Sequence, residues 1–299
     1  MGVNNWMQSG PGCCCHSIGP LYSACACYRF DAKKIVDGST YAPDQSNGLH
    51  LTSHDPNYVS GKLLYASQHT GYNYHEHDSH DCFMPREEGK EKWGSTGGRF
   101  GLNIWFWIKR VKPPGSASHP PNKIEYVVSK GEWANTNLGS FQPPNSDAGG
   151  FSGTWSIFID PTVSDSGSFH DIHFAVAYED GHTDTLCEED SWEDPTAWVF
   201  FFWWYEPTAG LAGAHTGRYS LIRNGVTVFD EQTVAIGDAA NPMEDHCRED
   251  LIVGKNLGTH LSETILIDNL GFSRRMGTKE QMMVRHNDLY AAGVGKECR

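Results

Sequence analysis

The chain has 299 residues and carries 23 lysines and arginines against 37 aspartates and glutamates, which gives a net charge of −14 with histidine neutral. Such an acidic chain repels a phosphate backbone, so nucleic-acid binding is not expected as its main activity. The 32 glycines and 15 prolines disfavour helix interiors, and with 20% charged residues they argue against a helical bundle and against disorder. The composition favours a loop-rich β protein.

No segment of the sequence is long and apolar enough to cross a membrane. The longest apolar run extends from Ala197 to Tyr205, whereas a membrane-spanning helix needs about 20 residues. The first residues, Met1 to Gly12, lack the cationic start and the apolar stretch of a secretory signal. We therefore expect no membrane span and no Sec-type signal in this stretch.

Residues 1–27 are rich in glycine, serine and cysteine without an apolar period, and we expect them to form a Cys-rich segment attached to one domain at residues 28–299. Five of the nine cysteines lie in this segment, at positions 13, 14, 15, 25 and 27, close to His16. These soft ligands suit a metal, but their spacing lacks the paired two-residue gaps of a zinc finger or ribbon. Disulfides, a contact between subunits and a flexible thiol-bearing tail remain open alternatives.

Short apolar or alternating runs, separated by turn-forming stretches, follow from Tyr28 onward, which is typical of a sheet-rich domain. We expect strands at residues 103–111, 124–129, 154–160, 172–178, 197–205, 219–223, 226–229 and 264–272. Long polar insertions rich in proline and glycine separate several of them. Loops of this kind are often where binding sites are built.

Two features of these strands can be predicted in more detail. Asn224 and Gly225 join two apolar runs, and this pair accepts the positive φ values of a type I′ turn, which predicts a β-hairpin. The run at 197–205 is large and apolar on both faces, which predicts a central strand covered on each side. Because neighbouring side chains of a strand alternate, Trp203 and Trp204 should point in opposite directions.

One helix is predicted, near the C-terminal end of the chain. Thr278 with Gln281 three residues later makes a capping box, which marks the start of a helix. Met282, His286 and Leu289 then follow at helical spacing. We therefore expect one short helix after the last strand.

The order of these pieces resembles the laminin G-like and concanavalin A-like lectin/glucanase superfamily, the jelly-roll sandwich of adhesion modules and phage fibres. The resemblance is carried by the strand at 102–109, the Ser-Lys-Gly at 129–131, the hairpin at 219–226 and the closing strand at 267–274. The family often has two histidines after a tryptophan, whereas Trp198 is followed here by Val199 and Phe200. The expected fold class is all-β, an antiparallel jelly-roll β-sandwich of concanavalin A-like type with a short C-terminal helix.

A histidine-rich motif at residues 75–81 concentrates imidazole and carboxylate groups, which are the ligand types of zinc and related metals. It nearly matches the metallo-β-lactamase motif, but its aspartate, Asp78, stands one place early and no apolar strand precedes it. The candidate metal ligands are His75, His77, His80 and Asp81. A solvated polar loop is the simpler interpretation.

An acidic stretch at residues 179–194 contains eight aspartates and glutamates. Hard oxygen ligands on a loop suit Ca²⁺, and the resemblance implies calcium near the binding edge of such sandwiches. An aromatic ring beside carboxylates could stack on a sugar while the acids accept hydroxyl hydrogen bonds. The candidate ligand-binding residues are Trp192, Asp184, Glu188 and Asp190. The alternatives are a solvated acidic loop that protects an edge strand, and packing of Trp192 onto the body of the domain.

Catalytic motifs are missing from the sequence. The glucanase branch of the superfamily places its carboxylates on alternate residues of one strand, and Glu263 to Asp268 has the wrong spacing for this. There is no Gly-x-Ser-x-Gly elbow, phosphate loop or dinucleotide fingerprint. We therefore expect no enzyme, with a glycan hydrolase as the third interpretation.

The predicted function is non-catalytic recognition or adhesion, in which edge loops bind carbohydrate or another surface ligand. The alternative is a virion structural protein, such as a fibre, spike or capsid decoration, in which the sandwich mediates assembly as a homo-oligomer or with other virion proteins. Either function implies an extracellular or virion location.

Overall fold

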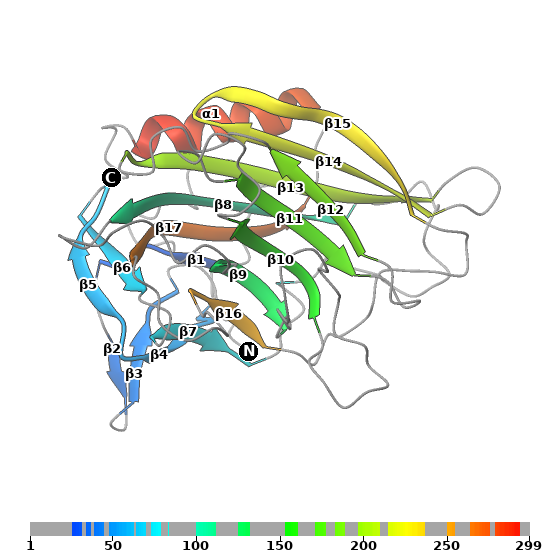
Figure 1. The fold of residues 1–299 in the computed structure, drawn as a ribbon. Coiled ribbons are helices and arrows are strands. Elements are labelled where there is room, and N and C mark those ends of the chain that lie inside the picture. Colours follow the sequence, from blue (N-terminus) through cyan, green and yellow to red (C-terminus); the bar gives the residue numbers. More distant parts are fainter. Residues whose placement is uncertain are drawn as a thin grey trace, which may run out of the picture.

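The computed structural model describes residues 26–31, 34–36, 39–44, 48–62, 64–69, 73–78, 83, 100–111, 125–131, 153–160, 171–177, 183–188, 197–209, 215–236, 250–254, 264–275 and 279–293. These residues form two antiparallel sheets that face each other, which we call sheets A and B. One helix lies on the outer face of sheet A (Figure 1). In the part of the chain that the structure describes, no helix is long and apolar enough to cross a membrane.

Sheet A is an eight-stranded sheet with the order β15-β14-β13-β8-β17-β6-β5, and β1 pairs with β17 beside this path. Its strands are β1 (Ala26–Tyr28), β5 (Asn57–Ser60), β6 (Tyr65–His69), β8 (Phe100–Val111), β13 (Val199–Ala209), β14 (His215–Arg223), β15 (Val226–Ile236) and β17 (Thr264–Arg275).

Sheet B is a nine-stranded sheet with the order β12-β11-β10-β9-β16-β7-β4-β3-β2. Its strands are β2 (Lys34–Val36), β3 (Ser39–Ala42), β4 (Leu51–His54), β7 (Tyr74–His77), β9 (Glu125–Gly131), β10 (Gly153–Asp160), β11 (Asp171–Ala177), β12 (Thr183–Glu188) and β16 (Leu251–Val253).

The main core lies between the two sheets, because alternate residues of each strand point inward. Ile104, Phe106 and Ile108 of β8 meet side chains of sheet B such as Ile157 and Phe174, and all five are at most 5% exposed. Burying one such side chain contributes about 1.5–3 kcal/mol relative to leaving it in water.

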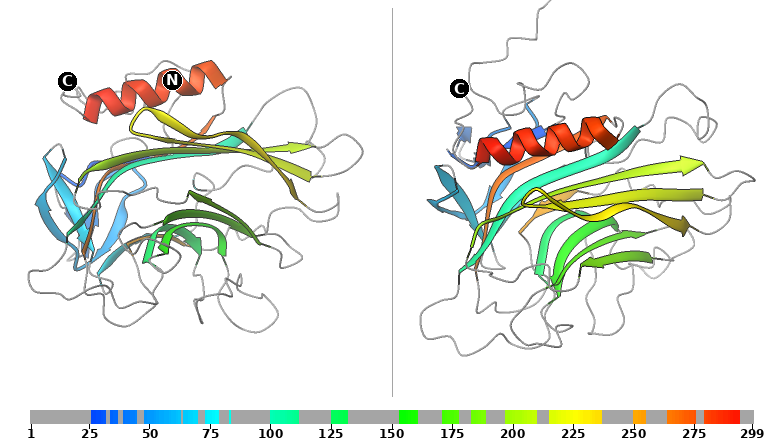
Figure 2. Two further views of the ribbon diagram at one scale, coloured as in Figure 1. Left: turned by 45° about the horizontal axis from the view of Figure 1, so that its top comes forward. Right: turned by 90° about the horizontal axis from the view of Figure 1, so that it is seen from above.

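Helix α1 (Lys279–Gly293) covers the outer face of sheet A, as the two views of Figure 2 show. Met282 and Leu289 pack there against an aromatic cluster of β8 and β13: Trp105, Trp107, Phe200, Phe202 and Trp204. The guanidinium of Arg285 lies 4.6 Å from the centre of the Trp105 ring. A Cβ at Gly271 would come within 2.1 Å of that indole, so only glycine leaves room for it there.

The strand and helix predictions agree well with this architecture. Each of the eight runs predicted to be strands overlaps an observed strand, and the predicted helix is α1. Asn224 and Gly225 have φ values of 47° and 88°, as the hairpin prediction requires. Trp203 belongs to the core between the sheets and Trp204 to the cluster under the helix, so the prediction of opposite directions is confirmed.

Two segments that the sequence favoured as loops are strands instead. Thr183–Glu188, inside the predicted acidic loop, form β12, which pairs with β11 along its whole length. The two β-branched threonines suit a strand, and backbone pairing there does not depend on an apolar face. The solvated loop expected for the histidine-rich motif is wrong for His75–His77, which lie in β7 between β4 and β16.

Strand β1 spans the predicted boundary between residues 27 and 28. Ala26, Cys27 and Tyr28 pair with Phe272, Gly271 and Leu270 of β17, respectively. Cys27 is 1% exposed and disulfide-bonded, so for this cysteine the disulfide alternative applies. Positions 13–16 and 25 lie outside the described residues.

Candidate functional site

Strand β7 carries two different groups of side chains on its two faces. His75 is fully buried and points into the sandwich, whereas Tyr74 and Glu76 on either side of it are partly exposed on the outer face of sheet B. This alternation follows from the period of two residues in a strand. The inner group is structural in character, and the outer group is accessible to a ligand.

On the inner face, both ring nitrogens of His75 are engaged by serine hydroxyls. Nδ1 lies 2.9 Å from Oγ of Ser53 on β4, and Nε2 lies 2.7 Å from Oγ of Ser67 on β6. A neutral imidazole donates one of these hydrogen bonds and accepts the other. His75 thereby links the two sheets, and it could bind a metal only by losing one of these bonds.

The rest of the predicted zinc site is not assembled within the described residues. The Nδ1 atom of His77 donates to the carbonyl oxygen of Asp78, and its ring lies edge-on to Phe83. His80 and Asp81 lie outside the described residues. Among the residues that the structure describes, no group of three or more histidine, cysteine or acidic side chains could hold a metal ion. The zinc site therefore stays a prediction.

A second buried histidine lies next to His75. His69 is 1% exposed, its Nδ1–H donates to the carbonyl oxygen of Asn73 at 3.2 Å, and its ring stands edge-on to His75 with the ring centres 5.3 Å apart. Burial lowers the pKa of His69 to about 4, against the smaller, raising effect of the Asn73 hydrogen bond. Gly254, with a φ of 77°, lies directly against this ring. His69 is therefore a neutral core residue near neutral pH.

On the outer face, His54, Tyr74 and Glu76 form a compact group that we call the β4–β7 face. The Nε2–H of His54 donates to Oε1 of Glu76 at 2.7 Å, and the side chains are 38% and 30% exposed. The His54 ring stacks on the Tyr74 ring, with the ring centres 4.3 Å apart and the planes 18° apart. The face thus combines an aromatic surface, a carboxylate and an imidazole in one exposed place.

The neighbours of the β4–β7 face follow from the strand register. Thr52 of β4 lies opposite Glu76 on one side, and Tyr41 of β3 lies opposite Thr52. Ile252 of β16 lies opposite Glu76 on the other side and is 5% exposed, so it forms an apolar border. Among these side chains, Glu76 carries the one carboxylate. A glycosidase uses a pair of carboxylates, and this group of side chains does not provide such a pair.

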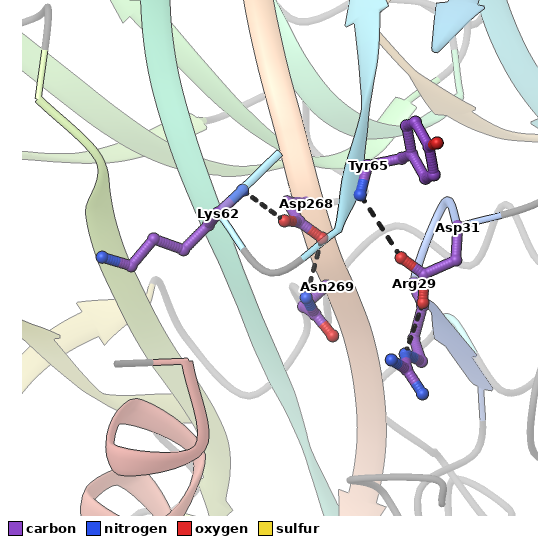
Figure 3. A network of polar contacts seen from close by, with 6 residues as sticks. All are labelled: Arg29, Asp31, Lys62, Tyr65, Asp268 and Asn269. Carbon is purple, nitrogen blue, oxygen red and sulfur yellow. Dashed lines mark hydrogen bonds and ion pairs between the residues drawn. The ribbon is translucent and has the colours of Figure 1, made fainter. Parts of the chain in front are cut away.

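A second polar group holds the turn between β5 and β6 in place (Figure 3). The buried carboxylate of Asp268 accepts hydrogen bonds from the backbone N–H of Lys62 at 2.8 Å and from the Asn269 side chain at 2.7 Å. Asp31 accepts a longer one, 3.4 Å, from the backbone N–H of Tyr65. The Lys62 ammonium lies 4.8 Å from the centre of the Trp107 ring. This group is best explained as an anchor for the turn.

Burial and an ion pair act against each other at Asp31. Desolvation raises the pKa of the Asp31 carboxyl, and the Arg29 guanidinium, 2.8 Å away, opposes this change. The anchored turn leaves Leu64 and Tyr65 58% and 50% exposed. Tyr65 therefore offers an exposed tyrosine on the other sheet for comparison with Tyr74.

The predicted acidic site is only partly visible. Asp184 and Glu188 lie on β12, the edge strand of sheet B, with Val176 and Ile172 of β11 as their register partners. Asp190 and Trp192 lie outside the described residues. These four residues therefore stay a prediction as a ligand or calcium site.

The outer group of β7 was not predicted from the sequence. Residues 75–81 resemble a single metal-ligand motif, whereas the strand directs His75 inward and Glu76 outward. The alternation of Tyr74, His75, Glu76 and His77 was a signal for a strand with two unlike faces. The partner His54 lies 22 residues away in the sequence and could not be paired with Glu76 without the sheet register.

Comparison with known proteins supports the fold. No family model matches the sequence, and no curated protein matches it. The botulinum neurotoxin type G receptor-binding domain is 11% identical with a TM-score of 0.52, over 88% of this chain and 51% of that chain. The botulinum neurotoxin serotype D ligand-binding domain in complex with N-acetylneuraminic acid is 12% identical with a TM-score of 0.50, over 92% and 52%.

A third structure, the receptor-binding domain of botulinum neurotoxin D, is 11% identical with a TM-score of 0.50, over 89% of this chain and 53% of that chain. This chain thus spans about half the length of the structures that it resembles. At such low identity the similarity shows the β-sandwich fold alone.

Proposed function

We propose that this chain is a non-catalytic recognition module that binds carbohydrate or another surface ligand, on a sandwich of the concanavalin A-like type. The observation that carries this proposal is the β4–β7 face, where the His54–Tyr74 ring stack and the Glu76 carboxylate are partly exposed side by side. An aromatic surface beside hydrogen-bonding groups suits an amphipathic ligand such as a sugar, which has apolar C–H faces and polar hydroxyls.

The fold is compatible with this proposal. The structures that this chain resembles are described as receptor-binding or ligand-binding domains, and one of them holds N-acetylneuraminic acid. Those ligands belong to the other proteins, but they demonstrate that a sandwich of this kind can present a binding surface. We accordingly propose an extracellular or virion location, where such ligands occur.

A glycan array tests the proposal directly. The full chain, labelled at lysines, should be retained on at least one class of glycan and should release no product from a polysaccharide panel. Retention should disappear after thermal unfolding, which controls for non-specific adhesion. Product release that is lost on mutating one pair of acids would favour a glycan hydrolase, and the absence of retention on every glycan would contradict carbohydrate binding.

We further propose that the acidic edge of sheet B contributes to ligand or calcium binding through Asp184, Glu188, Asp190 and Trp192. Oxygen ligands of this type suit Ca²⁺, and β12 supplies two of them at the edge of the sheet. Calorimetric titration of Ca²⁺ into the full chain should give heat that the double variant Asp184→Asn, Glu188→Gln loses. Equal heats for both proteins would contradict this site.

The virion alternative rests on the sequence. Size-exclusion chromatography with light scattering distinguishes a virion structural protein from a plain recognition module, because the structural protein should form a stable oligomer. A monomer retained on glycans would favour the plain recognition module.

A further inference from the structure

We infer that the β4–β7 face binds the ring of an uncharged sugar and discriminates against acidic sugars. This inference rests on the proposed function and assigns its ligand class to one place on the molecule. It is carried by three features of the face: its aromatic stack, its open hydrogen-bonding atoms and its charge.

The aromatic stack provides the apolar contact. Tyr74 and His54 lie on neighbouring strands at directly opposed register positions, and their rings are nearly parallel. Two rings held in this way lose little conformational freedom when a ligand packs on them, since each ring already supports the other. The C–H face of a pyranose ring can lie against such a surface, with its hydroxyls directed outward to polar groups.

The polar groups of the face retain hydrogen-bonding capacity. His54 uses Nε2–H and Glu76 uses Oε1 for the bond that joins them. Within the described residues, neither His54 Nδ1 nor Glu76 Oε2 makes a further hydrogen bond. Sugar hydroxyls can donate to both atoms, and a hydrogen bond to a carboxylate is stronger than one between neutral groups.

The charge of the face accounts for the discrimination. Glu76 is 30% exposed, and the whole chain carries a net charge of −14, so a carboxylate or sulfate on the ligand meets like charge. The second carboxylate oxygen of Glu76, which suits a hydroxyl, has no proton to offer an acidic group. The face therefore favours hydroxyl-rich, uncharged rings.

Saturation-transfer NMR on the full chain provides the test. The probes are the methyl glycosides of glucose, galactose, mannose and N-acetylglucosamine, together with those of N-acetylneuraminic acid and glucuronic acid. Because the face is open and small, we expect dissociation constants of about 1 mM. At least one neutral glycoside should bind, and each acidic glycoside should bind at least about tenfold more weakly.

Two variants of the face and one matched control locate the binding. Tyr74→Ala should abolish the transfer signal of the neutral glycoside. Glu76→Gln should weaken the binding of the neutral glycoside by about tenfold and reduce the discrimination against the acidic glycosides. Tyr65→Ala removes a tyrosine of sheet A that is 50% exposed, and it should leave the affinities for neutral and acidic glycosides unchanged. Unfolding midpoints of all variants close to that of the unmodified chain exclude misfolding.

The outcomes separate this inference from the proposed function. If glycans bind but Tyr74→Ala and Glu76→Gln behave like Tyr65→Ala, the binding site lies elsewhere and this inference is wrong, while the proposed function stands. Tighter binding of the acidic glycosides would also overturn the inference. If neither these glycosides nor a glycan array is bound, carbohydrate recognition itself is contradicted.

Discussion

At the scale of single residues, the buried His69 makes the stability of the sandwich depend on pH. Its pKa is about 4 in the folded chain and 6.5 in the unfolded chain. As the pH falls below about 6.5, the unfolded chain takes up the proton first, so the free energy of unfolding decreases until about pH 4. Above pH 6.5 this contribution is fully present. The expected loss is about 3 kcal/mol, since each pKa unit corresponds to about 1.4 kcal/mol.

Urea unfolding between pH 7.5 and pH 4 measures this loss. The variant His69→Asn keeps an N–H that can donate to the Asn73 carbonyl, and it should flatten the dependence. Burial also lowers the pKa of His286 in helix α1, so a smaller dependence of the same sign should remain in the variant. If the unmodified chain and the variant lose stability in parallel, His69 does not carry the effect.

At the scale of elements, helix α1 stabilises sheet A through one of its faces. Met282 is fully buried against the aromatic cluster, whereas Val284, two residues later, is 56% exposed. Met282→Ala should therefore lower the free energy of unfolding by about 2–4 kcal/mol, because it removes buried contacts and leaves a cavity. Val284→Ala in the same helix should change it by less than about 0.5 kcal/mol. Denaturant unfolding of both variants checks the contrast, and equal effects would refute this docking of the helix.

How far the elements could be predicted depended on their side chains. The long strands β8, β13 and β17 are rich in large apolar residues, so their positions were predictable from the sequence. The short strands β2 to β5 have few such residues. Strands β2 and β5 pair with the next strands along the chain, β3 and β6, whereas β4 also pairs with the more distant β7. The β4–β7 face was missed for the same reason, since only the register brings His54 next to Glu76.

At the scale of the whole molecule, the layers restrict where a ligand can bind. Helix α1 covers the outer face of sheet A (Figure 2). The aromatic cluster lies beneath the helix, and the main core fills the space between the sheets. The outer face of sheet B carries the β4–β7 face instead. Binding and stability should therefore be separable, so that variants of this face change affinity and leave the unfolding midpoint nearly unchanged.

The net charge of −14 then predicts how salt affects binding. Raising the salt from about 10 mM to about 1 M shortens the Debye length from about 30 Å to about 3 Å. A neutral glycoside has no charge to screen, so its affinity should stay within about twofold, whereas an acidic glycoside should bind more tightly as repulsion is screened. The same NMR titration at both salt concentrations measures this. In Glu76→Gln the salt effect on the acidic glycoside should be smaller but should persist, because the other acidic residues remain. A steep loss of neutral binding with salt would instead indicate an electrostatic contact that the β4–β7 face does not provide.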